Sequence, residues 1–143
     1  MAPIDFVIRD GFDSMDFDRV AEMLARSFWT PGISREEVIK GARHSALVVG
    51  AFLPNGTQVG YARAISDKTR FAYILDVFVD EPCRRSGIGQ AMVRHILDHE
   101  EMKGVYQWIL ITRDAHGVYR KAGFTELANP DRWMQIMRER PKR

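Results

Sequence analysis

Two arginines and two glycines stand together where a strand-like run gives way to a helix-like one. Arg84, Arg85, Gly87 and Gly89 follow residues 72–79, which are β-branched or aromatic with one charge. After Gly87 the apolar residues recur at helical spacing. The start of a helix presents unpaired N–H groups and partial positive charge, and glycines let an anion approach them. This junction predicts a phosphate or pyrophosphate site.

Two other known glycine-rich phosphate-binding motifs do not match the sequence of this loop. The Gly-x-x-x-x-Gly-Lys-Ser/Thr loop of nucleoside triphosphatases occurs nowhere in the chain. The dinucleotide fingerprint fails because Met92 stands where its last glycine or alanine is required. The remaining alternative is structural: the glycine pair only lets a helix pack closely against a strand.

A second motif follows in Asp114-Ala-His-Gly-Val-Tyr-Arg-Lys-Ala-Gly-Phe124. This segment resembles the Ala-x-x-x-Tyr-x-Lys-x-Gly-Phe element of the GNAT (Gcn5-related) N-acetyltransferase family. The loop from Arg84 to Gly89 is similar to that family's Arg/Gln-x-x-Gly-x-Gly/Ala signature. Both motifs have the family's order and spacing, and the resemblance covers the chain from about Phe6 to Met137.

The resemblance implies a fold and a cofactor. The fold would be α/β (α+β): a mixed, mostly antiparallel sheet of six to seven strands with about four helices, splayed between strands 4 and 5. Acetyl-CoA, the cosubstrate, would place its pyrophosphate on the loop and its pantetheine arm along the preceding strand. The implied cofactor-binding residues are Val77, Phe78, Val79, Arg84, Arg85, Ser86, Gly87, Ile88, Gly89, Gln90 and Tyr119.

The resemblance also suggests how the acetyl group moves. Tyr119 falls on the family's general-acid tyrosine, and a phenol pKa of about 10 suits proton donation to a thiolate whose acid has a pKa of about 8.5. The alternative for Tyr119 is a core aromatic on a short helix. For a base, Asp76 is the only carboxylate of its strand, and Tyr73 falls where some members carry glutamate. Asp76 is equally interpretable as a structural hydrogen-bond acceptor.

The predicted reaction is direct attack by a primary amine in a ternary complex. An alkyl ammonium with a pKa of roughly 10.4 must first lose a proton, which costs about 4 kcal/mol near neutral pH. By resemblance, the first two helices and the chain around residues 63–70 wall the acceptor cleft. Trp29, Arg63 and Asp67 are its candidate substrate-binding residues. The acceptor is expected to be a small-molecule or peptidyl amine.

The order of predicted elements supports one domain over residues 1–143. Helices are expected after the caps at 13–17, from Ser34 to about Ala42, after Gly87, and at 115–122. Asn55-Gly56 predicts a hairpin turn. Strands are expected at 6–9, 46–53, 58–66, 72–79, 105–112 and 132–137.

Composition narrows the class of protein. Hydrophobic residues make up 45% and charged residues 28% of 143 residues, with a net charge of +2, as in an ordinary globular domain. One cysteine fits a reducing, cytoplasmic setting, and no apolar run approaches a membrane span.

No nucleic-acid partner is expected because the basic tail carries no aromatic platform, and no metal because His116 has no second histidine at ligand spacing. The sequence leaves open whether the protein forms a homodimer. A non-catalytic acyl-CoA-binding or regulatory module is the competing function.

Overall fold

The computed structural model describes residues 3–143, and their strands form one five-stranded sheet in chain order. The first three pairings are antiparallel, and the last, β4 with β5, is parallel. The prediction of a mixed, mostly antiparallel sheet is therefore confirmed. The strands are β1 (Val7–Asp10), β2 (Leu47–Phe52), β3 (Gln58–Ser66), β4 (Phe71–Val79) and β5 (Gln107–Leu110).

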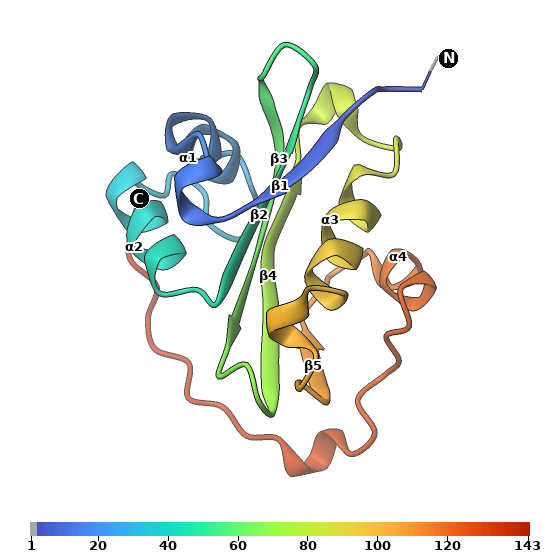
Figure 1. Cartoon of the computed structure of the whole chain (residues 1–143). Helices are drawn as coiled ribbons and strands as arrows, with labels where there is room; N and C mark the ends of the chain where they lie inside the picture. The colour runs from blue at the N-terminus through green and yellow to red at the C-terminus, as the bar shows by residue number, and fades with distance from the viewer. Residues whose placement is uncertain (1–2) are drawn as a thin grey trace.

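Helices cover both faces of this sheet (Figure 1). α1 (Phe17–Ala25) and α2 (Arg35–Arg43) lie on one face, and α3 (Ile88–Leu97) lies on the other, with α4 (His116–Lys121) beyond it. Short 3-10 turns occur at Phe12–Ser14, Glu81–Cys83, Glu100–Met102 and Pro130–Arg132. The two faces give the protein two hydrophobic layers separated by the sheet.

Each layer is built on a helical stripe that was readable in the sequence. On α3 the stripe consists of Ile88, Met92, Val93 and Ile96, all buried against β1 to β4. On α1 it is Val20, Met23 and Leu24, which pack with residues of β3 and β4. Burial of each such side chain stabilises the fold by roughly 1.5–3 kcal/mol. The helices are thereby fixed against the strands that carry the candidate site.

The prediction of six to seven strands is wrong, because residues 132–137 form no strand. Trp133, Met134, Ile136 and Met137 are exposed instead of packed on a sheet edge. Figure 1 shows this part of the chain passing around the end of the sheet from α4 to α2. Alternating apolar residues favour a strand only where an edge lies alongside, and this path leads away from β5.

An irregularity in β4 shapes the centre of the sheet. Tyr61 of β3 pairs with Phe78 and Arg63 pairs with Leu75, so Asp76 and Val77 together stand opposite one residue. Asp76 has a φ of +56°, a value that is uncommon outside glycine. The two bulged residues interrupt the ladder, as β-bulges near functional sites do.

β4 and β5 separate just before this bulge. Their parallel pairing runs only from Phe71–Gln107 to Ile74–Leu110, and β4 continues to Val79 without a β5 partner. This is the position at which the sheet was expected to splay. The gap leaves the β5-facing edge of residues 75–79, the part of β4 that includes the bulge, without a strand partner.

Candidate active site

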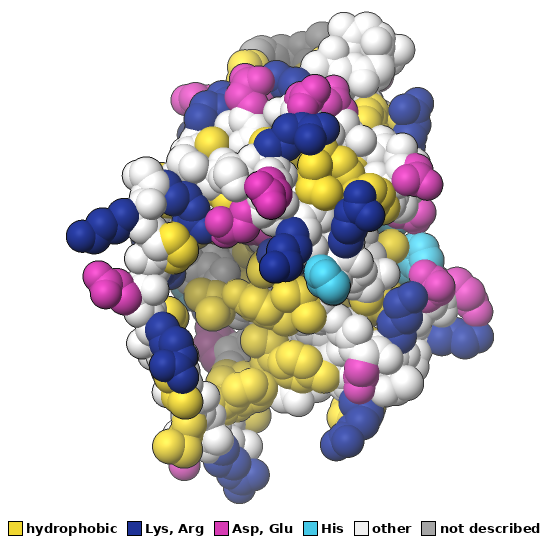
Figure 2. Space-filling model, turned by 90° about the vertical axis from the view of Figure 1, so that its left-hand side faces the viewer, with side chains coloured by type: hydrophobic (Ala, Val, Ile, Leu, Met, Phe, Trp, Pro, Cys, Tyr) yellow, Lys and Arg dark blue, Asp and Glu magenta, His cyan; other side chains and the backbone are white. Residues whose placement is uncertain are grey.

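A cavity of about 900 Å³ lies where β4 and β5 part. It reaches from the bulge and α4 on one side to α1, α2 and the end of the chain on the other. Figure 2, which looks at the side of α1 and α2, shows hydrophobic side chains around a hollow there. Its lining includes Trp29, Glu37, Lys40, Tyr61, Arg63, Tyr73, Leu75, Asp76, Val77, Leu110, Tyr119, Arg140 and Arg143.

The predicted phosphate loop presents unused backbone donors. In the described part of the chain, the N–H groups of residues 85–90 donate no hydrogen bond, and the first helical bond runs from Ala91 to Gly87. Gly87, the N-cap of α3, has a φ of +84°, and Arg85 has a φ of +63°. A Cβ placed on Gly87 would meet no atom within 4 Å, so the approach is open. Consecutive free N–H groups in such a turn make an anion-binding concavity.

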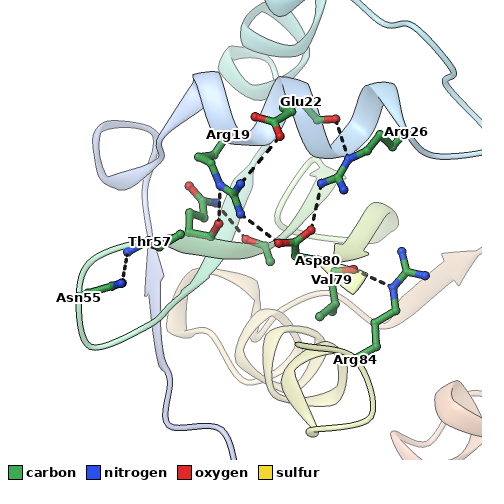
Figure 3. Close-up of polar contacts among 10 residues, drawn as sticks. Arg19, Glu22, Arg26, Asn55, Thr57, Val79, Asp80 and Arg84 are labelled. Atoms are coloured by element: carbon green, nitrogen blue, oxygen red, sulfur yellow. Dashed lines mark hydrogen bonds and ion pairs between the residues drawn. The ribbon is translucent and has the colours of Figure 1, made fainter. Parts of the chain in front are cut away.

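Arg84 fastens this loop to the strand that precedes it. Its Nε donates to the carbonyl oxygen of Val79 at 2.9 Å (Figure 3). Its guanidinium carbon lies 5.2 Å from the ring centroid of Phe78. These contacts fix the guanidinium of Arg84 against the end of β4. Arg84 therefore links the loop directly to the end of β4.

Asp80, which directly follows β4 and precedes the loop, binds two arginines, a contact that sequence reasoning missed. Arg19 of α1 and Arg26, the residue that follows α1, converge on its carboxylate at 3.2 and 3.0 Å (Figure 3). Burial acts to raise the pKa of Asp80, but the hydrogen bonds from Arg26 and Arg19 outweigh it and lower that pKa. No local pattern reveals this contact because the arginines are 61 and 54 residues away in sequence.

Tyr119 lies on α4 and lines the same cavity as the bulge residues Asp76 and Val77. Its ring packs edge-on against Phe124, with centroids 6.0 Å apart. Within residues 3–143 its hydroxyl has no hydrogen-bond partner, and burial raises its pKa. A phenol in this setting keeps its proton until a stronger base appears beside it.

Three candidates from the sequence form a single network on the cavity wall. Asp76 accepts hydrogen bonds from Arg63 Nε at 2.7 Å and from Trp29 Nε1 at 3.0 Å. Arg63 also donates to the carbonyl of Gly41 and to the hydroxyl of Ser45, at the end of α2. With both oxygens engaged and only 9% of its side chain exposed, Asp76 fits the structural interpretation better than that of a free base.

Tyr73 also lines the cavity, whereas Asp67 does not. Burial raises the pKa of the half-buried Tyr73 hydroxyl. Asp67 lies in the exposed turn between β3 and β4. Its carboxylate accepts the N–H groups of Arg70, Thr69 and Phe71, which lower its pKa. The structure thus does not bring Asp67 to the acceptor side, because the turn uses its oxygens.

Comparisons with known proteins agree with this geometry. Residues 44–126 match the family described as "Acetyltransferase (GNAT) domain", which is more than half of the chain. The chain belongs to the GNAT acetyltransferase family. It is 32% identical over 92 residues to glucosamine 6-phosphate N-acetyltransferase 1 of Oryza sativa subsp. japonica, a match that covers 60% of this chain and 56% of the relative. The chain therefore spans little more than half the length of that relative.

Solved structures of the GNAT family show the same fold. A GNAT-family protein from Xanthomonas campestris pv. campestris is 30% identical, with a TM-score of 0.87 and 95% of each chain covered. A Clostridium acetobutylicum protein whose crystal structure was determined with acetyl-CoA is 17% identical, has a TM-score of 0.69, and matches over 93% of this chain and 96% of its own. GNAT acetyltransferases use acetyl-CoA, and the free N–H groups of residues 85–90 suit its pyrophosphate.

Two further structural facts concern metals and membranes. Among residues 3–143, no group of three or more His, Cys, Asp or Glu side chains is placed to hold a metal ion. No helix in that range is both long enough and apolar enough to cross a membrane.

Proposed function

We propose that residues 1–143 form one N-acetyltransferase domain that moves an acetyl group from acetyl-CoA to a primary amine by direct attack. The observation that carries this proposal is the single cavity that joins Tyr119 and the β4 bulge to the side of α1 and α2. Two substrates that enter from opposite sides meet there. A covalent relay through Cys83 is disfavoured because this thiol is buried outside the cavity lining, and burial raises its pKa.

Acetyl-CoA supplies an activated acetyl thioester when bound. In the proposal, the N–H groups of residues 85–90, with Arg84 and Arg85 beside them, hold the pyrophosphate. The separated edge of β4, residues 77–79, receives the pantetheine arm in the manner of an added strand. Val77 of the bulge lines the cavity, and its backbone N–H is the proposed donor that polarises the thioester carbonyl.

Tyr119 is the proposed general acid. Its position in the lining of the cavity that the bulge also lines, and its raised pKa, support donation to the departing sulfur. A donor is needed there because charge develops on sulfur as the acetyl group leaves. General acid catalysis contributes typically ~10²–10⁴-fold to the rate.

The amine must also lose a proton before or during attack. Tyr73 is a poor base because burial raises its pKa and keeps the hydroxyl protonated. Asp76 already accepts two hydrogen bonds. These contacts support Asp76 as the residue that holds the bulge in place. In the proposal, the amine passes its proton to solvent.

The charge of the cavity rim suggests which acceptors to test first. Lys40 and Arg140 line the side near α2, and neither has a carboxylate partner within the described residues. An amine that carries a phosphate would meet these cations, and the rice relative is named for such a substrate, glucosamine 6-phosphate. Our first candidate acceptor is therefore a small phosphorylated amine, with peptidyl amines as the second class.

A substrate panel tests the proposal against the non-catalytic alternative. Pure protein is incubated with acetyl-CoA and one of glucosamine 6-phosphate, glucosamine, spermidine or a lysine-containing peptide. Thiol release above an amine-free control and an acetylated product in the mass spectrum are expected for at least one of them. Tight acetyl-CoA binding without product from any of these amines would favour an acyl-CoA-binding or regulatory module.

A further inference from the structure

One fully buried hydroxyl in the cavity wall has no hydrogen-bond partner. Tyr61 of β3 is fully buried, and its Oη is the one enclosed side-chain polar atom within residues 3–143 that lacks any partner. Buried hydroxyls are almost always hydrogen-bonded, because leaving one unpaired forfeits its hydration. An exception that lines a cavity points to a group that enters from the cavity.

The fold holds the Tyr61 ring in one place. The ring belongs to the hydrophobic layer formed with α1 and α2, and in the sheet Tyr61 pairs with Phe78 of β4. Its hydroxyl is within the electrostatic influence of both Arg63 and Asp76, and burial raises its pKa far above the ordinary value. The hydroxyl is therefore neutral, rigidly mounted, and beside the bulge at which the reaction is proposed to occur.

The neighbouring polar groups cannot take over this position. Asp76 is engaged by Trp29 and Arg63, and Arg63 also contacts the end of α2. Tyr73 and Tyr119 are partly exposed, so solvent can reach them. Tyr61 alone combines complete burial with an unused hydroxyl at this wall.

We propose that Tyr61 positions the acceptor: its hydroxyl oxygen accepts a hydrogen bond from an N–H of the primary amine and turns the nitrogen lone pair toward the β4 bulge. The inference rests on the proposed function and adds the residue that aims the nucleophile. An amine keeps its lone pair for attack, so its N–H groups require acceptors within the cavity. The acceptor class is a primary amine, because a substituted nitrogen would reach an enclosed hydroxyl less easily.

Tyr61→Phe removes the hydroxyl and keeps the ring. Because no intramolecular hydrogen bond is lost, the variant should melt at the wild-type temperature or above it, and acetyl-CoA affinity should stay within twofold. The KM of the best amine in the panel should rise and kcat/KM should fall about tenfold, or ~1.4 kcal/mol. Tyr106→Phe is the matched control, since Tyr106 is exposed and outside the cavity lining. Unchanged kcat/KM, or a lower Tm with a parallel loss of acetyl-CoA binding, would overturn the inference.

A binding measurement separates this inference from the proposed function. In protein labelled with ¹³Cζ-tyrosine, the Tyr61 resonance is assigned by its disappearance in Tyr61→Phe. Glucosamine 6-phosphate, or another amine of the panel, should shift that resonance when added with coenzyme A. A shift without turnover would support the role of Tyr61 and contradict the acetyltransferase proposal. Turnover without a shift would support the acetyltransferase proposal and contradict the role of Tyr61.

Discussion

Arg63 Nε lies 2.7 Å from Asp76 Oδ2, and both side chains are nearly enclosed, at 16% and 9% exposure. This ion pair ties β3 to the residue of β4 that has a φ of +56°. A non-glycine residue in that conformation persists only where its surroundings hold it. The pair therefore couples the backbone of the bulge to the wall formed by α2, which Arg63 also contacts.

Asp76→Asn tests this coupling. Asparagine tolerates positive φ and still accepts from Trp29, but it leaves Arg63 as an uncompensated charge. Removing one partner of a buried pair costs about 3–5 kcal/mol, so the free energy of unfolding in urea should fall by an amount of that order. The residual kcat/KM should keep the shape of the wild-type pH profile. Loss of the acidic limb without loss of stability would instead identify Asp76 as the general base.

Tyr119→Phe tests the general acid. The substitution keeps the packing on Phe124 and removes the proton, so kcat should fall by ~10²–10⁴-fold with acetyl-CoA affinity nearly unchanged. Tyr106→Phe serves as the control for loss of a phenol elsewhere. A kcat within twofold of wild type, with chemistry shown to be rate-limiting, would assign the proton to water or another donor.

The sequence predicted the features that depend on local patterns, and it missed those that depend on contacts between distant residues. The strand at 58–66 has the bounds predicted for it, and Ser34 caps α2 as expected, because alternation and capping are local. The ion pairs of Asp80 and the lack of a hydrogen-bond partner for the Tyr61 hydroxyl depend on residues far apart in sequence. The strand predicted at 132–137 fails for the same reason, since a local pattern does not specify an available sheet edge.

Gly87→Val tests the phosphate loop. Valine strains the backbone at a φ of +84° and projects into the open space above the free N–H groups, so acetyl-CoA binding should weaken at least ~10-fold in calorimetry. Gly56→Val is the matched control, because Gly56 has a φ of +90° and equally open surroundings in a distant hairpin. Both variants should lose similar stability. Equal acetyl-CoA affinity in the two would contradict the assigned loop.

Asp80→Asn tests whether α1 holds the loop in place for the cofactor. Two arginine hydrogen bonds outweigh burial and lower the pKa of Asp80 in the folded state, so its stabilising contribution is fully present above the unfolded pKa of about 3.9. That contribution is lost as the pH falls through the lower, folded-state pKa. The difference in unfolding free energy between wild type and Asp80→Asn should therefore be constant near neutral pH and shrink in acid.

If Asp80 also orders the loop, acetyl-CoA should bind the variant about threefold to tenfold more weakly at pH 7, through faster dissociation. A stability difference that grows in acid would contradict the ion-pair assignment. Unchanged affinity would show that the loop is ordered by Arg84 alone.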